Sequence, residues 1–284
     1  MDTELARTFL AVVAAGSFVK AAERLYVTQS TVSARIQSLE EQLGCQLFVR
    51  NKAGTVLTNA GRQFQKHATT LLRVVAQARQ DVGVPRGFRA SLTIGARIGI
   101  WERLISHALV QLRAVVPDVA VRAEIGFEEE LMLGLVEGRL DIGVMYTPQS
   151  RPGLNVELVA REELVLVSTD PGDATGRGEP GPNYVYIDWG PEFFARHNTA
   201  FPEFTGPALS TNVGWLGLQH ILAHGGAGYF PRRLIAAELA AGRLTALPGA
   251  PTFELPAYVV YPLEREASVF EPALEVIRRV AAAT

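Results

Sequence analysis

The stretch TQSTVSARIQSLEEQLG (residues 28–44) predicts a helix with two chemically different faces. Its apolar residues recur at the three- and four-residue steps of an amphipathic helix, at Val32, Ile36, Leu39 and Leu43. Thr28 is a favourable N-cap, because its hydroxyl can accept a hydrogen bond from the first helical turn, and Gly44 suits the helix end. We therefore expect a helix over residues 29–43 with one buried and one polar face.

The polar face begins with short side chains, as a helix requires if its N-terminus enters the major groove of DNA. There a Gln can bond adenine through two hydrogen bonds, the methyl group of a Thr can touch thymine, and an Arg one turn later can reach a guanine or a phosphate. The candidate DNA contacts of this helix are Thr28, Gln29, Ser30, Thr31, Ser33 and Arg35. The alternative is an ordinary solvated face on a three-helix unit.

The segments on either side complete a predicted winged helix-turn-helix over residues 1–58. Two helices are expected before the quoted stretch and a hairpin of two short strands after it, over residues 4–15, 18–25, 47–50 and 55–58. The turn of the hairpin contains Asn-Lys-Ala-Gly. Arg50 and Lys52 near its tip are candidates for contact with the DNA backbone or a minor groove.

A long helix follows over residues 59–82, with Thr58 as its expected N-cap. Its apolar positions alternate in steps of four and three, at Phe64, Ala68, Leu71, Val75, Ala78 and Val82. Such a seam favours a coiled coil between two chains. Gly83, Pro85 and Gly87 then interrupt the chain, so residues 59–89 are the expected dimerisation helix and hinge.

From residue 90 onward, predicted strands alternate with predicted helices, which is typical of a mostly parallel sheet covered by helices. A break near residue 160, between the expected strands VELVA and LVLVST, suggests two α/β lobes. Lobe I is expected over about 90–160 and 264–284, and lobe II over about 161–263. Ligands of such sheets bind beyond the carboxyl ends of the strands and, here, between the lobes.

Composition narrows the class of protein. Of 284 residues, 48% are apolar and 20% charged, as in a globular chain, and no apolar run predicts a transmembrane helix or a secretory signal. We therefore expect a cytoplasmic protein.

Charge is distributed unevenly along the chain. Residues 1–80 carry ten Lys/Arg and five Asp/Glu, whereas the remainder carries 17 and 24, so a basic head joins an acidic body. No P-loop, G-x-S-x-G or dinucleotide fingerprint follows a strand, which argues against an enzyme.

Residues 1–62 resemble the winged helix-turn-helix of LysR-type transcriptional regulators. The matching positions are Thr8-Phe9, Gly16-Ser17-Phe18, Ala21-Ala22, Leu25, Thr28-Gln29-Ser30, Val32-Ser33, Ile36, Leu39-Glu40, Leu43-Gly44, Leu47-Phe48, Arg50, Leu57-Thr58 and Gly61. The segments LVEGRLDIGVM (135–145) and GGAGYFPRRL (225–234) are also similar to family segments. Residues 2–5 and 188–193 are similar to the branch containing the flagellar-master-operon repressor. Ser30, Ala34 and Arg35 depart from the common family pattern, so the operator preference of other members is not carried over.

The resemblance implies an α + α/β chain: a winged helix-turn-helix, a long linker helix and a two-lobed effector domain of the periplasmic-binding-protein type. It implies a transcriptional regulator without a cofactor. The expected partners are double-stranded DNA with a pseudo-palindromic operator and a small-molecule effector between the lobes. The expected assembly is a homodimer or a homotetramer. Contact with RNA polymerase is left open.

The expected effector site begins at GARIGIW (95–101), after the first strand of the effector domain. Where many family members have Ser or Thr, this chain has Arg97, which could bind a carboxylate through two hydrogen bonds, with Trp101 as an apolar wall. The candidate effector contacts are Arg97, Ile98, Gly99, Trp101, Phe127, Glu128, Tyr146, Thr147, Thr211, Asn212, Gly228 and Tyr229. An acidic or aromatic effector would suit this set. The alternative is an internal pair between Arg97 and Glu128.

The cysteine and histidines do not indicate a metal site. Cys45 is the only cysteine, so it cannot form an intrachain disulfide, and we expect it to be a buried packing residue. His220 and His224 are one helical turn apart, but no third ligand falls at a recognisable spacing.

Overall fold

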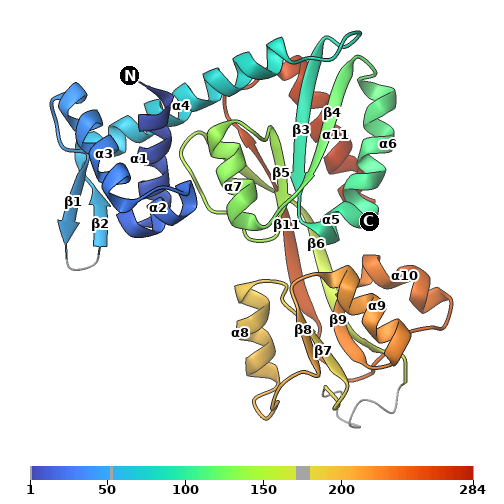
Figure 1. Ribbon diagram of the computed structural model, residues 1–284. Coiled ribbons are helices and arrows are strands. Elements are labelled where there is room, and N and C mark those ends of the chain that lie inside the picture. The colour runs from blue at the N-terminus through green and yellow to red at the C-terminus, as the bar shows by residue number, and fades with distance from the viewer. Residues whose placement is uncertain (1, 52–53, 171–179, 284) are drawn as a thin grey trace.

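The structure is a computed structural model that describes residues 2–51, 54–170 and 180–283. Figure 1 shows three parts: a small N-terminal helical unit with a hairpin, a long helix, and a two-lobed body. The long helix runs from the N-terminal unit across to the upper lobe, and the second lobe lies below the first. No helix among these residues is both long and apolar enough to cross a membrane.

The N-terminal unit has the predicted order of elements. These are α1 (Thr3–Ala15), α2 (Phe18–Leu25), α3 (Gln29–Leu43), β1 (Phe48–Asn51) and β2 (Gly54–Leu57). Its core joins helices and hairpin, because the ring centroid of Phe9 lies 5.1 Å from that of Phe48 and 5.0 Å from that of Phe64. Aromatic side chains bury large apolar areas, so these contacts hold the helices and the hairpin in one core. Cys45 is exposed in the turn after α3, so the expectation that it is buried is wrong.

The long helix α4 (Asn59–Val82) begins as predicted, with the Thr58 hydroxyl accepting from the Gly61 amide at 2.9 Å. Gly61 is required by a close approach, since a Cβ there would lie 2.2 Å from the Leu47 carbonyl oxygen. The apolar seam is shared between two roles. Phe64 and Ala68 are buried in the core of the N-terminal unit, whereas Val82 is 91% exposed. Only the later part of the seam is therefore open to a second chain, and dimerisation through it stays a prediction.

The body is built on one mixed nine-stranded sheet, in the order β4-β3-β5-β11-β6-β9-β7-β8, with β10 paired to β6. Its strands are β3 (Ala90–Ala96), β4 (Val119–Ile125), β5 (Ile142–Met145), β6 (Leu154–Ser168), β7 (Tyr184–Ile187), β8 (Leu209–Thr211), β9 (Ala227–Pro231), β10 (Thr245–Ala246) and β11 (Phe253–Pro262). Its helices are α5 (Ile98–Ile100), the π-helical turn η1 (Trp101–Ile105), α6 (Ser106–Val115), α7 (Glu128–Glu137), α8 (Pro191–Ala200), α9 (Gly214–His224), α10 (Arg232–Ala240) and α11 (Ala267–Ala282).

Two long antiparallel strands, β6 and β11, run through both lobes (Figure 1). The prediction of two separate strands near residue 160 is wrong, because β6 is continuous from Leu154 to Ser168. The expectation of a mostly parallel sheet holds only for the flanking strands, since β6 and β11 pair antiparallel with their neighbours. The β6–β11 register shifts between Ala257 and Tyr258, opposite residues 158–160. The junction of the lobes thus coincides with a β-bulge, a device that bends a strand without ending it.

Candidate DNA-binding surface and effector cleft

The start of α3 presents a short polar surface. The Thr28 hydroxyl accepts from the Thr31 amide at 3.2 Å and lies 2.8 Å from the Ser30 hydroxyl. Gln29 and Ser30 are exposed, whereas Thr31 and Ser33 are half-buried and Val32 is fully buried. The buried face packs into the unit, so the polar first turn faces outward. This is the geometry that a major groove accepts.

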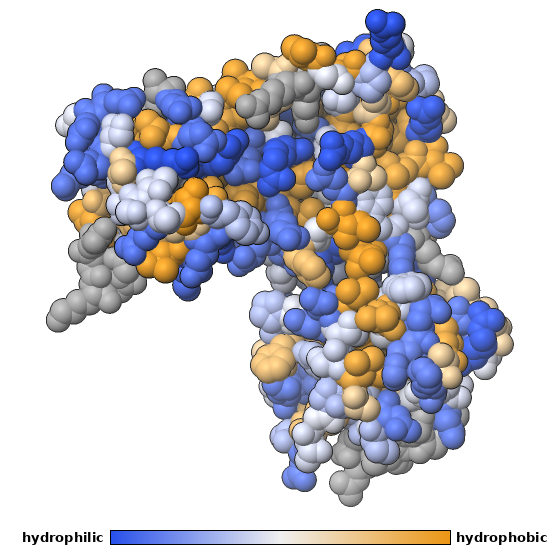
Figure 2. All heavy atoms as spheres, in the orientation of Figure 1, coloured by the Kyte–Doolittle hydropathy of each residue, from blue (hydrophilic) through white to orange (hydrophobic). Residues whose placement is uncertain are grey.

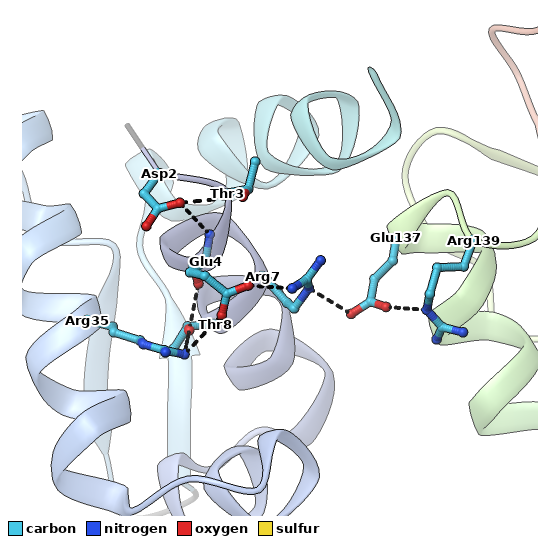
Figure 3. Close-up of polar contacts among 8 residues, drawn as sticks. All are labelled: Asp2, Thr3, Glu4, Arg7, Thr8, Arg35, Glu137 and Arg139. Carbon is cyan, nitrogen blue, oxygen red and sulfur yellow. Dashed lines mark hydrogen bonds and ion pairs between the residues drawn. The ribbon is translucent and has the colours of Figure 1, made fainter. Parts of the chain in front are cut away.

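Arg35, one turn later, is not free on this surface. One of its guanidinium nitrogens lies 3.4 Å from the Glu4 carboxylate and donates to the Thr8 hydroxyl at 3.3 Å. Figure 3 shows Arg35 reaching toward α1, where Glu4 also pairs with Arg7. Arg35 therefore holds α3 against α1 in the free chain. Contact with DNA would require the side chain to leave Glu4, and its role as a DNA contact stays a prediction.

Glu40 is a positioning residue that the sequence did not single out for this role. Its carboxylate accepts from the backbone amides of Leu47 and Phe48, at 2.7 and 3.2 Å. Charged acceptors make the stronger class of hydrogen bond. Glu40 thus fixes the first wing strand to the recognition helix. Of the predicted wing contacts, Arg50 lies in β1 and Lys52 lies outside the described residues, and both stay predictions as DNA contacts.

Replacing Glu40 with Ala should lower the free energy of unfolding by about 2 kcal/mol, because two part-buried amides lose a charged acceptor. Glu41 is the matched control, since among the described residues its carboxylate accepts only from the Gln37 side-chain amide, on the exposed side of the same helix. Glu41→Ala should change stability by less than about 0.5 kcal/mol. Urea unfolding of both variants measures the difference. Equal losses would show that Glu40 does not anchor the wing.

At the predicted effector cleft, Arg97 stands immediately before α5 and is only 7% exposed. Its guanidinium lies 3.4 Å from the Glu128 carboxylate and 4.6 Å from the centroid of the Phe127 ring. Of the two alternatives left open by the sequence, the structure contains the internal pair. The distance is long for a charge-assisted hydrogen bond, so this is a loose ion pair. It lies at a position that is largely shielded from solvent.

Tyr146, after β5 in lobe I, and Trp189, after β7 in lobe II, contact each other at the junction of the lobes. Their rings meet edge to face at 6.3 Å, and the Trp189 indole donates to the Tyr229 carbonyl at 2.9 Å. A Cβ on Gly99 would touch the Trp189 ring at 3.4 Å and the Tyr146 hydroxyl at 3.5 Å. The Tyr146 hydroxyl is buried without a hydrogen-bond partner among the described residues. Burial raises the pKa of Tyr146, so the phenol is neutral and free to donate.

The structure separates the predicted effector residues into two groups. Those near the Tyr146–Trp189 contact are Arg97, Gly99, Phe127, Glu128, Tyr146 and Thr147, with Ile98 half-buried beside them. Trp101 instead donates to the Glu124 carbonyl of β4, at 2.9 Å, and packs on lobe I. The Tyr229 hydroxyl donates to the Pro251 carbonyl within lobe II, and Gly228 is buried against Ile221. The Thr211 hydroxyl accepts from the Val213 amide and Asn212 is exposed, so neither is drawn into the cleft contacts.

A buried ion pair of lobe II lies at the boundary with lobe I. Arg233, at the start of α10 in lobe II, lies 2.7 Å from the Glu162 carboxylate on β6, and both side chains are 6% exposed. Arg233 also donates to the Gly99 carbonyl at 3.0 Å and to the Glu102 carbonyl, both in lobe I. Burial raises the pKa of Glu162 although Arg233 opposes the shift. Arg233 therefore ties lobe II to the α5–η1 turn of lobe I.

Comparison with known proteins decides the family. The family model "Bacterial regulatory helix-turn-helix protein, lysR family" matches residues 3–62, and the LysR substrate binding domain matches residues 85–173. The HTH-type transcriptional regulator HdfR of Yersinia pestis (strain Pestoides F) is 31% identical over 270 residues, covering 92% of this chain and 90% of HdfR. The chain belongs to the LysR-type transcriptional regulators.

The relatives agree with this assignment over the whole length. HdfR of Salmonella schwarzengrund (strain CVM19633) is 30% identical over 264 residues, covering 92% of both chains. Among solved structures, ArgP from Mycobacterium tuberculosis matches with a TM-score of 0.61 and 24% identity, covering 99% of this chain and 98% of ArgP. LysG from Corynebacterium glutamicum, solved with bound effector Arg, matches with a TM-score of 0.57 and 18% identity, covering 100% and 99%. The likeness to ArgP and LysG is a likeness of fold. The family is one of DNA-binding regulators with an effector-binding domain, not of enzymes.

In this LysR-type regulator, the alternation of buried and exposed residues along β6 marks Glu162 as a buried charge. Along β6, Glu162, Leu164 and Leu166 are buried, whereas Arg161 and Glu163 are exposed. A charged side chain on the buried face of a strand requires a partner. Nothing in the sequence distinguishes Arg233 from its neighbour Arg232, which is exposed and pairs with Glu163. The described residues contain no group of three His, Cys, Asp or Glu side chains that could hold a metal ion.

Proposed function

We propose that this regulator binds a pseudo-palindromic operator in double-stranded DNA as a homodimer or homotetramer, and that a small organic acid between its lobes changes this binding. The DNA sequence is read by the polar side chains at the start of α3, which are Thr28, Gln29, Ser30, Thr31 and Ser33. Arg50 and Lys52 contact phosphates. Activity on DNA places the protein in the cytoplasm, and activation would add a contact with RNA polymerase. The exposed short side chains at the start of α3 support the DNA-reading part.

The observation that carries the effector part is the loose pair between Arg97 and Glu128. A ligand carboxylate that replaced Glu128 could form two hydrogen bonds with Arg97, under the Phe127 ring. The buried hydroxyl of Tyr146 adds a polar group without a hydrogen-bond partner among the described residues. An aromatic acid fits these surroundings best. LysG, whose effector is Arg, is a relative in fold with a carboxylate-bearing effector.

A thermal-shift screen of aromatic and aliphatic carboxylic acids tests this proposal. An acid that binds the native state raises the melting temperature by mass action. Arg97→Met should abolish that rise. Arg122→Met is the control, because Arg122 lies on the outer strand of lobe I with its side chain 76% exposed, and it should keep the rise. If no acid raises the melting temperature, or if Arg97→Met responds like the unchanged chain, the regulator works without an acid at this site.

Substitution of the wing cations gives a separate prediction. Arg50→Ala should weaken binding to specific and unrelated duplexes alike and reduce the slope of log K against log salt by about 1, because one phosphate contact is lost. Gel shifts over a salt series measure the slope. An unchanged slope would show that the wing cation does not contact phosphate.

A further inference from the structure

The DNA-binding unit is docked on lobe I of its own chain. Arg7 of α1 lies 3.7 Å from Glu137 of α7, and Arg24 of α2 lies 2.9 Å from Glu129. Figure 3 shows the first of these contacts continuing from Arg35 through Glu4 and Arg7 to Glu137. Figure 2 shows a row of hydrophilic residues across the same boundary. The recognition helix is therefore joined to the effector domain through side chains as well as through α4.

The two surfaces line an open cavity of about 320 Å³. Its apolar wall comes from both sides of the boundary, from Leu10, Val13, Ala14, Met132, Leu133 and Val136. Gln65 and Thr69 of α4 line it as well, and Arg24 and Arg151 bring positive charge to it. A volume of this size is at the lower end of the range for small-molecule sites.

The charged side chains around this cavity differ in whether they have a partner of opposite charge. Arg24 pairs with Glu129, and Glu130 uses its carboxylate to accept from the Phe127 amide at the start of α7. Arg151 donates to the Gln149 side chain and makes no ion pair with any described residue. Burial, and then the neighbouring Arg24, lower the pKa of Arg151. Arg151 thus supplies an unpaired cation beside an apolar wall.

We propose that this cavity, between α1, α4 and α7, is a second ligand site that binds a small amphipathic carboxylate, with the carboxylate on Arg151 and the apolar tail against Leu10 and Leu133. A ligand here touches the DNA-binding unit and lobe I together. It therefore stabilises the docked arrangement and biases the regulator's domain geometry. The site is independent of the effector proposed for the interlobe cleft.

Calorimetric titration of the whole 284-residue chain with sodium octanoate, and with 1-octanol as the uncharged probe, tests the proposal. Octanoate should bind saturably at millimolar concentrations. Arg151→Met should weaken octanoate about tenfold or more while leaving octanol unchanged, because only the charge-assisted contact is removed. Ala14→Phe, which fills the cavity, should weaken both probes.

Arg97→Met separates this site from the interlobe cleft and should leave octanoate binding unchanged. If octanoate does not bind the unchanged protein, the proposal is overturned. It is also overturned if Arg151→Met binds octanoate as tightly as the unchanged protein, or if Arg97→Met abolishes octanoate binding. Circular dichroism of each variant confirms the fold, and Arg151→Met keeps the test valid if Ala14→Phe fails to fold.

Discussion

Arg233→Met should lower the free energy of unfolding by about 3 kcal/mol or more, because it leaves the Glu162 carboxylate buried without its counter-ion. Both partners are 6% exposed, so water cannot replace the lost charge. Arg232→Met is the matched control. Arg232 precedes Arg233 directly, and its pair with Glu163 is 55% and 48% exposed, so this change should cost less than about 0.5 kcal/mol. Urea unfolding measures both.

The loss in Arg233→Met should also depend on pH. Burial raises the pKa of Glu162 above its ordinary value, and removing Arg233 raises it further. The folded variant then binds a proton that the unfolded chain has released. Its stability should therefore fall as the pH rises from the ordinary glutamate pKa through the raised pKa of the folded state. The double change Arg233→Met with Glu162→Leu should recover most of the loss and the pH dependence. A loss equal to that of Arg232→Met, or independent of pH, would contradict the buried-pair account.

Ser30→Trp should abolish sequence-specific DNA binding and leave only the weaker non-specific binding. Ser30 is exposed in the first turn of α3, where a large ring would hold the helix N-terminus out of the groove. Specific affinities exceed non-specific ones by about a thousandfold or more, which sets the size of the expected loss. The free energy of unfolding should stay nearly unchanged, because the Ser30 side chain is exposed.

Glu41→Trp is the control for this change, because Glu41 is equally exposed but lies three turns farther along the same helix. It should retain specific binding. Gel shifts with a specific and an unrelated duplex measure both variants. If Ser30→Trp still discriminates between the duplexes, the start of α3 does not read the bases.

Local patterns predicted the DNA-binding unit well. The bounds of α3 and α4 and both threonine caps follow from apolar spacing and side-chain hydrogen bonding within a few residues. The alternation of strands and helices likewise indicated the two lobes. It could not show that β6 is continuous, because a strand that crosses between lobes changes its surroundings near residue 160 and looks like two strands.

The site depended on contacts that local patterns do not contain. Whether Arg97 meets Glu128 or a ligand depends on how α5 and α7 are placed by the sheet. The same is true of Arg233, whose partner lies 71 residues earlier in the chain. The aromatic candidates lie apart for a similar reason. The Trp101 indole donates to a backbone carbonyl on β4, so this side chain packs on lobe I and not in the cleft.

The central claim is that the exposed start of α3 reads a DNA sequence. The regulator can select duplexes from a random-sequence pool, and the selected duplex can then compete with a scrambled duplex of the same composition at fixed salt. We predict a preference of about a thousandfold or more for the selected duplex, since specific contacts add to a shared electrostatic affinity. Equal affinities for the two duplexes would contradict the account.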